Sequence, residues 1–193
     1  MVERAIQGDQ MASRQLYDQF AKPMFNLCYR ILNNEGDARD VLQESFIKIF
    51  QNLHQLQKEE LLPAWIKRIC TNTALQHFEK RNRIRFDELD LNTQFISSED
   101  YELELNEKEF EFQIDQLKAA IQKLPDRYRI VFTMYAIEDF SHEEIAKMLG
   151  IVSSTSRSQY LRAKQKILEI LKKNNSDVRS IKKIYSEAQG SLG

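Results

Sequence analysis

Three stretches in the first 85 residues place apolar side chains every three or four positions, the spacing of one face of an α-helix. The first stretch spans about residues 9–33 and contains Pro23, which predicts that this helix is kinked or divided. The second runs from about Asp37 to Leu56. The third begins at Pro63, a residue favoured in the first turn of a helix, and ends in a basic run. We therefore predict a small helical bundle.

A second pattern lies between residues 140 and 171. Ser141 and Glu144 have the spacing of a capping box, which starts a helix, and Gly150 can adopt the positive φ that turns the chain. A further helix is expected to start among residues 153–155. The inward stripe of that helix is Ser156, Tyr160, Ala163, Ile167 and Leu171. Two helices joined in this way form a helix-turn-helix.

The composition supports a helical fold class. The chain has 193 residues, of which only 5 are Gly and 3 are Pro, fewer than the many tight turns of a sandwich or barrel need. We predict an all-α protein of two small helical domains joined by an acidic linker. The expected boundaries are 1–85 for the first domain, 86–111 for the linker, 112–173 for the helix-turn-helix domain and 174–193 for a tail.

The formal net charge of −1 hides a strong segregation of charge along the chain. Residues 86–116 hold eleven acidic residues and one basic residue, whereas the segments on either side are basic. The linker is either a solvated acidic loop or, because it interleaves several large apolar residues, a segment that docks on a partner or on the folded domains.

No pattern in the sequence points to catalysis. Cys28 and Cys70 lie far apart and the three histidines lack ligand spacing, so we expect reduced thiols and no metal or other cofactor. No apolar run is long enough for a transmembrane helix, and the first residues lack the core of a secretory signal. The sequence therefore predicts a cytoplasmic binding protein rather than an enzyme.

Polar and basic faces supply the candidate binding residues. The second helix carries Asp40, Gln43, Glu44 and Lys48 on one polar face. The outward face of the third helix carries Lys67, Arg68, Thr71 and Asn72. The basic run after it includes Arg81 and Arg83; these cations either favour the helix C-terminus or contact phosphates.

The second helix of the helix-turn-helix is also basic. In this motif the N-terminal part of that helix enters the major groove of DNA. Arg157 is placed to read a guanine edge, and Ser158, Leu161 and Arg162 share its face. Thr155, Arg162 and Lys164 are better placed for phosphates, which position a protein without specifying sequence.

Together these segments resemble the sigma factors of bacterial RNA polymerase. The segment DARDVLQESFIKIF is similar to the region 2 helix, and PAWIKRICTNTA to the promoter-reading helix that follows it. The segments LPDRYRIVF, FSHEEIAKMLGI and TSRSQYLRAK resemble region 4. No counterpart of region 3 lies between these segments. This domain layout resembles that of the extracytoplasmic-function (ECF) sigma factors.

The resemblance implies a dissociable initiation subunit of core RNA polymerase. It implies that the face with Asp40, Gln43, Glu44 and Lys48 docks on polymerase, and that the loop from His54 to Leu62 captures a base flipped out of the minus-ten element. It places the third helix on the minus-ten element and the helix from Thr155 on the minus-thirty-five element. An anti-sigma factor is a further expected partner, and Trp65 either packs in the core or stacks on a base.

Two other function classes stay open at this point. A conventional regulator would use the helix-turn-helix alone and would bind DNA without polymerase. A protein of the anti-sigma type would bind polymerase without reading promoters. An enzyme is the most distant possibility.

Overall fold

The fold is helical throughout the part of the chain that the computed structural model describes, which is residues 1–82 and 107–190. For residue 82 and for residues 107–114 and 174–190 only the backbone is described. The N-terminal half consists of α1 (Val2–Ile6), α2 (Gln10–Leu32), α3 (Glu35–Asn52) and α4 (Leu62–Asn82). Two short 3₁₀ turns, η1 (Leu53–Gln55) and η2 (Glu59–Leu61), connect α3 to α4. The all-α prediction is confirmed.

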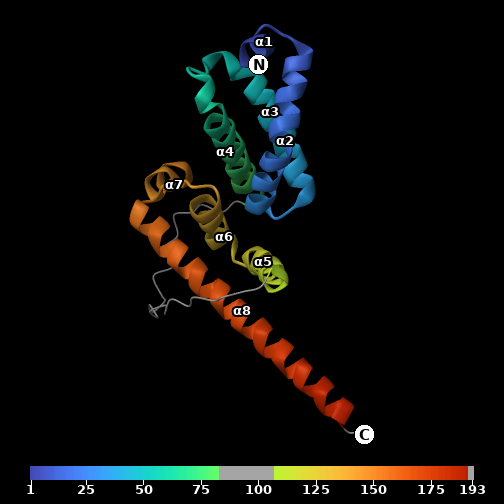
Figure 1. The fold of residues 1–193 in the computed structure, drawn as a ribbon. Coiled ribbons are helices and arrows are strands. Elements are labelled where there is room, and N and C mark those ends of the chain that lie inside the picture. Colours follow the sequence, from blue (N-terminus) through green and yellow to red (C-terminus); the bar gives the residue numbers. More distant parts are fainter. Residues whose placement is uncertain (83–106, 191–193) are drawn as a thin grey trace.

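The C-terminal half consists of α5 (Glu107–Gln122), α6 (Asp126–Phe132), the π-helical turn η3 (Thr133–Ile137), α7 (His142–Leu149) and α8 (Ser153–Gly190). Because α5 begins at Glu107, the last residues of the predicted linker are helical, while residues 86–106 lie outside the described part. Figure 1 shows α8 running past the other helices as one long rod. The backbone of residues 174–190, which lie in the predicted tail, continues α8.

Local sequence signals explain where the helices begin and end. The Asp9 side chain caps α2 by accepting hydrogen bonds from the backbone of Met11 and Ala12, at 2.9 and 3.1 Å. Asn33 ends the same helix in the left-handed conformation, at φ 52°. Pro23 lies inside α2 without dividing it. The α1 helix was not predicted.

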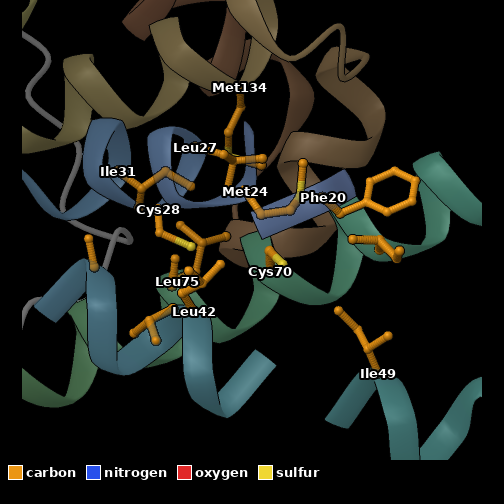
Figure 2. Packing of buried hydrophobic residues seen from close by; sticks show 14 of the residues in the cluster. Phe20, Met24, Leu27, Cys28, Ile31, Leu42, Ile49, Cys70, Leu75 and Met134 are labelled. Atoms are coloured by element: carbon orange, nitrogen blue, oxygen red, sulfur yellow. The ribbon is translucent and has the colours of Figure 1, made fainter. Parts of the chain in front are cut away.

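The main hydrophobic core joins the two halves of the chain. In the N-terminal half, α2, α3 and α4 pack against one another and bury leucine, isoleucine and phenylalanine side chains. The same core contains Ile130, Val131, Met134, Phe140, Ile145 and Leu149 from the C-terminal half. Figure 2 shows Met134 approaching Leu27 and Met24 of α2 from the opposite side. A second, smaller cluster holds α5 and α6 against α8.

Candidate polymerase and promoter interfaces

The polar face of α3 is exposed as predicted. Asp40, Gln43 and Glu44 are solvent-exposed, and Lys48 is half-buried at the side of this face. The Lys48 ammonium lies 2.7 Å from the Glu44 carboxylate and lowers its pKa by a hydrogen bond. The same ammonium donates to the Thr73 hydroxyl of α4 at 3.3 Å. Lys48 therefore links the polar face to the space between the two helices.

Two apolar side chains next to this polar face were not predicted as surface residues. Ile47 is 58% exposed and Phe50 is 36% exposed. Ile47 lies one turn after Gln43 and Glu44, so it projects from the same side of the helix. An apolar centre with a polar rim is the usual anatomy of a protein interface. The signal available from sequence for Ile47 was its position outside the apolar stripe of the helix, whereas Phe50 belongs to that stripe.

A groove of about 400 Å³ separates α3 from α4. Its walls carry amides, a lysine and an indole: Lys48, Asn52, Gln55, Trp65, Ile69, Asn72, Thr73 and Gln76. The side-chain amide of Gln55 donates to Oδ1 of Asn52 at 3.0 Å, and Nδ2 of Asn52 in turn donates to the backbone carbonyl of Lys48 at 2.8 Å. Trp65 packs against the core and also lines the groove, so its core packing is confirmed, while stacking on a base stays a prediction.

The groove presents hydrogen-bonding side chains beside a flat aromatic ring. Side-chain amides present donors and acceptors that match the edge of an unpaired base, and a flat indole offers a stacking surface. The loop from His54 to Leu62 contributes Gln55 to the lining of the groove. That loop is held by the buried Leu53 and by an ion pair between the Met1 amino group and Glu59, at 3.7 Å.

The four residues predicted on the outward face of α4 do not share one surface. Thr71 is buried and its hydroxyl donates to the Lys67 carbonyl at 2.9 Å, so the prediction that it faces DNA is wrong. Leu75, one turn after Thr71 on the same side of α4, is buried as well. The reason is that α2 and α3 both pack on α4 and cover a wider arc than one apolar stripe. Asn72 lines the groove instead.

Lys67 and Arg68 lie on the side of α4 that meets the C-terminal half. The Lys67 ammonium donates to the Glu138 carbonyl at 2.7 Å and lies 5.6 Å from the centre of the Phe140 ring. Arg68 is exposed, and its charge lowers the pKa of Glu144 in α7 after the larger effect of the hydrogen bonds from Ser141. The structure thus separates these two cations from the groove residue Asn72.

The basic run that begins in the last turn of α4 is only partly described. Arg81 forms an ion pair with Asp37 at the start of α3, and His77 lies 3.5 Å from the same carboxylate. The charge of Arg81 is therefore matched within the protein, although its side chain stays exposed. Arg83 lies outside the described residues.

The helix-turn-helix forms as predicted. Ser141 and Glu144 make the complete capping box, Gly150 ends α7 at φ 67°, and α8 starts at Ser153. Arg157, Leu161 and Lys164 are exposed on α8. Thr155, Ser158 and Arg162 are half-buried. The Arg157 guanidinium donates to the Ser153 hydroxyl at 3.1 Å and lies 3.5 Å from the Glu143 carboxylate of α7.

One polar residue on the buried side of α8 has a partner that sequence reasoning missed. The Ser156 hydroxyl shares a hydrogen bond of 2.9 Å with Nδ1 of His142. The His142 ring stacks on Tyr135, with ring centres 4.1 Å apart, and approaches Tyr160. Burial, followed by the nearby Arg157 charge, lowers the pKa of His142.

The described residues offer no sign of two other kinds of site. Within residues 1–82 and 107–190, histidine, cysteine and acidic side chains do not gather into a group that could hold a metal ion. In the same residues, none of the helices combines the length and the apolar character needed to cross a membrane.

Comparison with known proteins identifies both halves. Residues 16–84 match the family described as Sigma-70 region 2, and residues 114–167 match Sigma-70, region 4. Two solved structures have a similar fold. One is CnrH in complex with the cytosolic domain of CnrY, with a TM-score of 0.52 and 20% identity over 89% of this chain and 94% of that chain. The other is the Bartonella quintana sigma factor RpoE in complex with the anti-sigma factor NepR, with a TM-score of 0.53 and 19% identity over 82% of this chain and 96% of that chain.

Curated relatives are similar along most of the chain. The ECF RNA polymerase sigma factor SigE of Mycolicibacterium smegmatis is 33% identical over 88% of this chain, which spans 66% of that protein. SigW of Bacillus subtilis is 27% identical over 89% of this chain and 95% of its own length. The ECF RNA polymerase sigma-E factor of Salmonella typhimurium is 30% identical over 86% of this chain and 90% of its own length. The chain belongs to the ECF sigma factors of RNA polymerase.

Proposed function

We propose that this sigma factor divides its work among three surfaces: the polar face of α3 for polymerase, the groove between α3 and α4 for the minus-ten element, and the exposed face of α8 for the minus-thirty-five element. An ECF sigma factor directs core RNA polymerase to specific promoters and helps to nucleate promoter melting. The observation that supports the assignment is that one chain carries two separate features, an amide-lined groove between α3 and α4 and a helix-turn-helix.

The polymerase surface consists of Asp40, Gln43, Glu44 and Lys48, together with the exposed Ile47. Ion pairs at the rim set orientation and association rate, while the apolar side chain supplies buried area. Removing both carboxylates therefore weakens binding without disturbing the core.

The groove is proposed to take the captured base. Extruding a base from the duplex costs a few kcal/mol, which contacts inside the pocket must offset. Asn72 and Gln76 face the groove from α4, and Asn52 and Gln55 face it from the other side. Stacking on Trp65 adds the sequence-tolerant part of the binding energy.

The face of α8 is proposed to read the minus-thirty-five element. Arg157, Ser158, Leu161 and Arg162 lie at its N-terminal end, where a recognition helix meets base edges. Thr155 and Lys164 serve phosphate contacts. Arg68 is proposed to contact the minus-ten DNA, and Arg81 and Arg83 are proposed phosphate contacts. Thr71 has no place in this surface because it is buried.

We place residues 1–85 in the polymerase and minus-ten unit and residues 112–173 in the minus-thirty-five unit, with 86–111 between them and 174–193 as a tail. In this proposal the chain has no catalytic step of its own and acts in the cytoplasm with polymerase. An anti-sigma factor is a proposed partner, supported by the Bartonella quintana sigma factor of similar fold that was solved with one.

The test is run-off transcription with the purified chain and its core polymerase on candidate promoters. A promoter-specific transcript is expected, and Asp40→Ala with Glu44→Ala should lower affinity for core polymerase at unchanged thermal stability. The matched control removes two exposed acidic residues elsewhere, with Glu3→Ala and Asp18→Ala. Equal affinity for both double variants would refute the α3 assignment, and DNA footprinting without polymerase would favour a conventional regulator.

A further inference from the structure

Arg157, the proposed reader of guanine, is held by two residues to which the proposed function gives no part. Its guanidinium donates to the hydroxyl of Ser153, one turn earlier in α8, at 3.1 Å. A second nitrogen of the same guanidinium lies 3.5 Å from the carboxylate of Glu143, which belongs to α7. Both side chains of this ion pair are more than half exposed. The guanidinium is therefore placed by contacts from both helices of the motif while it stays accessible from solvent.

The position of Glu143 beside α8 is fixed by its neighbours in α7. Glu143 follows His142, whose Nδ1 shares the 2.9 Å hydrogen bond with the Ser156 hydroxyl of α8. It also lies in the first turn of α7, which the capping box of Ser141 and Glu144 closes. Because the backbone is held on both sides of this residue, its carboxylate approaches the recognition helix from a fixed point.

A carboxylate at this place works against general attraction between α8 and DNA. Duplex DNA carries one negative charge about every 1.7 Å along its axis, so an acidic side chain beside the reading end of the helix is repelled by it. The exposed ion pair adds little to the stability of the fold. An unrestrained arginine, however, reaches phosphates in many orientations, and such contacts carry no sequence information. The effect of Glu143 is therefore to restrict where the Arg157 guanidinium can point.

We propose that Glu143 is a positioning residue for Arg157, which keeps the guanidinium directed at a base edge and away from phosphates. It thereby raises the sequence preference of the recognition helix and lowers its general affinity for DNA. The inference rests on the proposed function, because it takes Arg157 as a reader of the minus-thirty-five element. The Ser153 bond uses one N–H group of the guanidinium, and two others suffice for a bidentate contact with guanine. Specificity is a difference between affinities, so disfavouring the phosphate-bound orientation is enough to raise it.

Base preference and general affinity should change in opposite directions when Glu143 loses its charge. In transcription from a randomised minus-thirty-five library with core polymerase, Glu143→Gln should reduce the preference at the base pair read by Arg157 by up to about fivefold, the range for an exposed ion pair. Binding of the free chain to DNA of unrelated sequence, measured by fluorescence anisotropy at low salt, should become tighter. A loss of both quantities, or an equal gain on all sequences, would overturn the positioning role.

A double variant shows whether Glu143 acts through Arg157. Arg157→Ala should remove the preference at this base pair, and Glu143→Gln added to it should change the preference no further. The control is Glu169→Gln, which neutralises an exposed carboxylate paired with Lys166 on the same helix as Arg157 and should leave the preference unchanged. An effect of Glu143→Gln on base preference in the absence of Arg157 would mean that Glu143 contacts DNA itself, which would overturn the proposal.

A measurement without DNA tests the restraint on the side chain. NMR relaxation of the Arg157 Nε–H group in the free, full-length chain should report an ordered guanidinium, and Glu143→Gln and Ser153→Ala should each raise its mobility on the picosecond-to-nanosecond timescale. Equal mobility of this group in the wild type and in Glu143→Gln would overturn the restraint.

The two proposals fail in different ways. If the wild type shows no base preference in the library, or if Arg157→Ala leaves every preference in place, the reading of the minus-thirty-five element by Arg157 fails and the positioning role falls with it. If Arg157→Ala removes a preference that Glu143→Gln retains in full, only the positioning role is refuted.

Discussion

Ser156 shows how a single polar residue is accommodated in an apolar stripe. It occupies a fully buried position of α8, and its hydroxyl is satisfied by His142 from the first helix of the motif. Since an unsatisfied buried hydroxyl costs about 1–3 kcal/mol, the pair fixes how α7 and α8 meet. The stability of the helix-turn-helix therefore depends on whether the His142 imidazole is protonated.

The folded helix-turn-helix should lose stability as pH falls below neutrality. The pKa of His142 is lowered by burial and by Arg157, against the smaller opposing effect of Glu143; Tyr135, Tyr160 and Ser156 also face the ring. Above the unfolded pKa of about 6.5 the ring is neutral in both states and stability is complete. Below it the unfolded chain takes up the proton more readily, so stability falls.

Thermal denaturation at pH 7.5 and pH 5.5 checks this expectation. The wild type should lose a few degrees more in Tm between these two values than His142→Gln does. His54→Gln removes an exposed histidine and should retain the wild-type difference. If His142→Gln shows the full wild-type loss, another group carries the pH dependence.

Thr71 and Asn72 are neighbours in sequence with opposite environments, and they make a second test at the residue scale. Thr71→Val removes a buried hydroxyl that bonds only within its own helix, so transcription and stability should change little. Asn72→Ala removes an amide from the groove and should slow promoter opening about tenfold at unchanged stability. The reverse order of effects in run-off and melting assays would restore Thr71 to the DNA surface.

The ends of the helices could be predicted from the sequence, but the residues that other helices cover could not. Asp9, Ser141 with Glu144, and Gly150 act through their own backbone neighbours, so their roles can be read from short sequence windows. Thr71 could not be assigned in this way, because its burial depends on two helices that pack from different sides. Periodicity identifies the apolar face of a helix without telling which other helix covers it.

The recognition helix α8 carries cations that should act differently. Arg157 lies at its N-terminal end, and Lys164 lies two turns further on. Loss of a bidentate arginine–guanine contact costs roughly 1–3 kcal/mol at one base pair, whereas loss of a phosphate contact weakens all sequences and reduces the salt slope by about one unit.

Transcription from a randomised minus-thirty-five library compares the two cations directly. Arg157→Ala should flatten the preference at a single position, while Lys164→Ala should lower every promoter alike. A uniform loss of transcription for Arg157→Ala would mean that α8 presents a different face to the major groove of DNA.

At the scale of the whole molecule, the sequence indicated two units but not their contact. Arg129 donates to the Ile31 carbonyl at the end of α2, and Glu138 accepts a hydrogen bond from the Arg30 side chain. In the sequence both resemble ordinary surface charges, because these partners are not nearby in the chain. The segregation of charge, in contrast, was visible at once. Its structural setting at residues 86–106 lies outside the described part of the chain.

The acidic segment should weaken binding of the free protein to DNA. Residues 86–106 carry seven acidic residues and no basic ones, so they compete with phosphates for the basic surfaces on either side. Replacing them with a Gly/Ser sequence of equal length should raise non-specific DNA affinity at low salt, as measured by fluorescence anisotropy, with the gain vanishing at high salt. A linker with unchanged composition but shuffled order serves as the control; if it matches the Gly/Ser variant, charge is not the cause.

The π-helical turn at Thr133–Ile137 determines the direction in which the next residue, Glu138, points about the helix axis. The Glu138 amide bonds to the Thr133 carbonyl five residues back, at 3.0 Å, so this turn holds more residues than the 3.6 of an α-helical turn. Deleting one residue would let the α-helical pattern continue and would rotate Glu138 by about 100° about the helix axis. A single-residue change in chain length, with every charged side chain retained, would thus turn Glu138 away from Arg30 and Lys67.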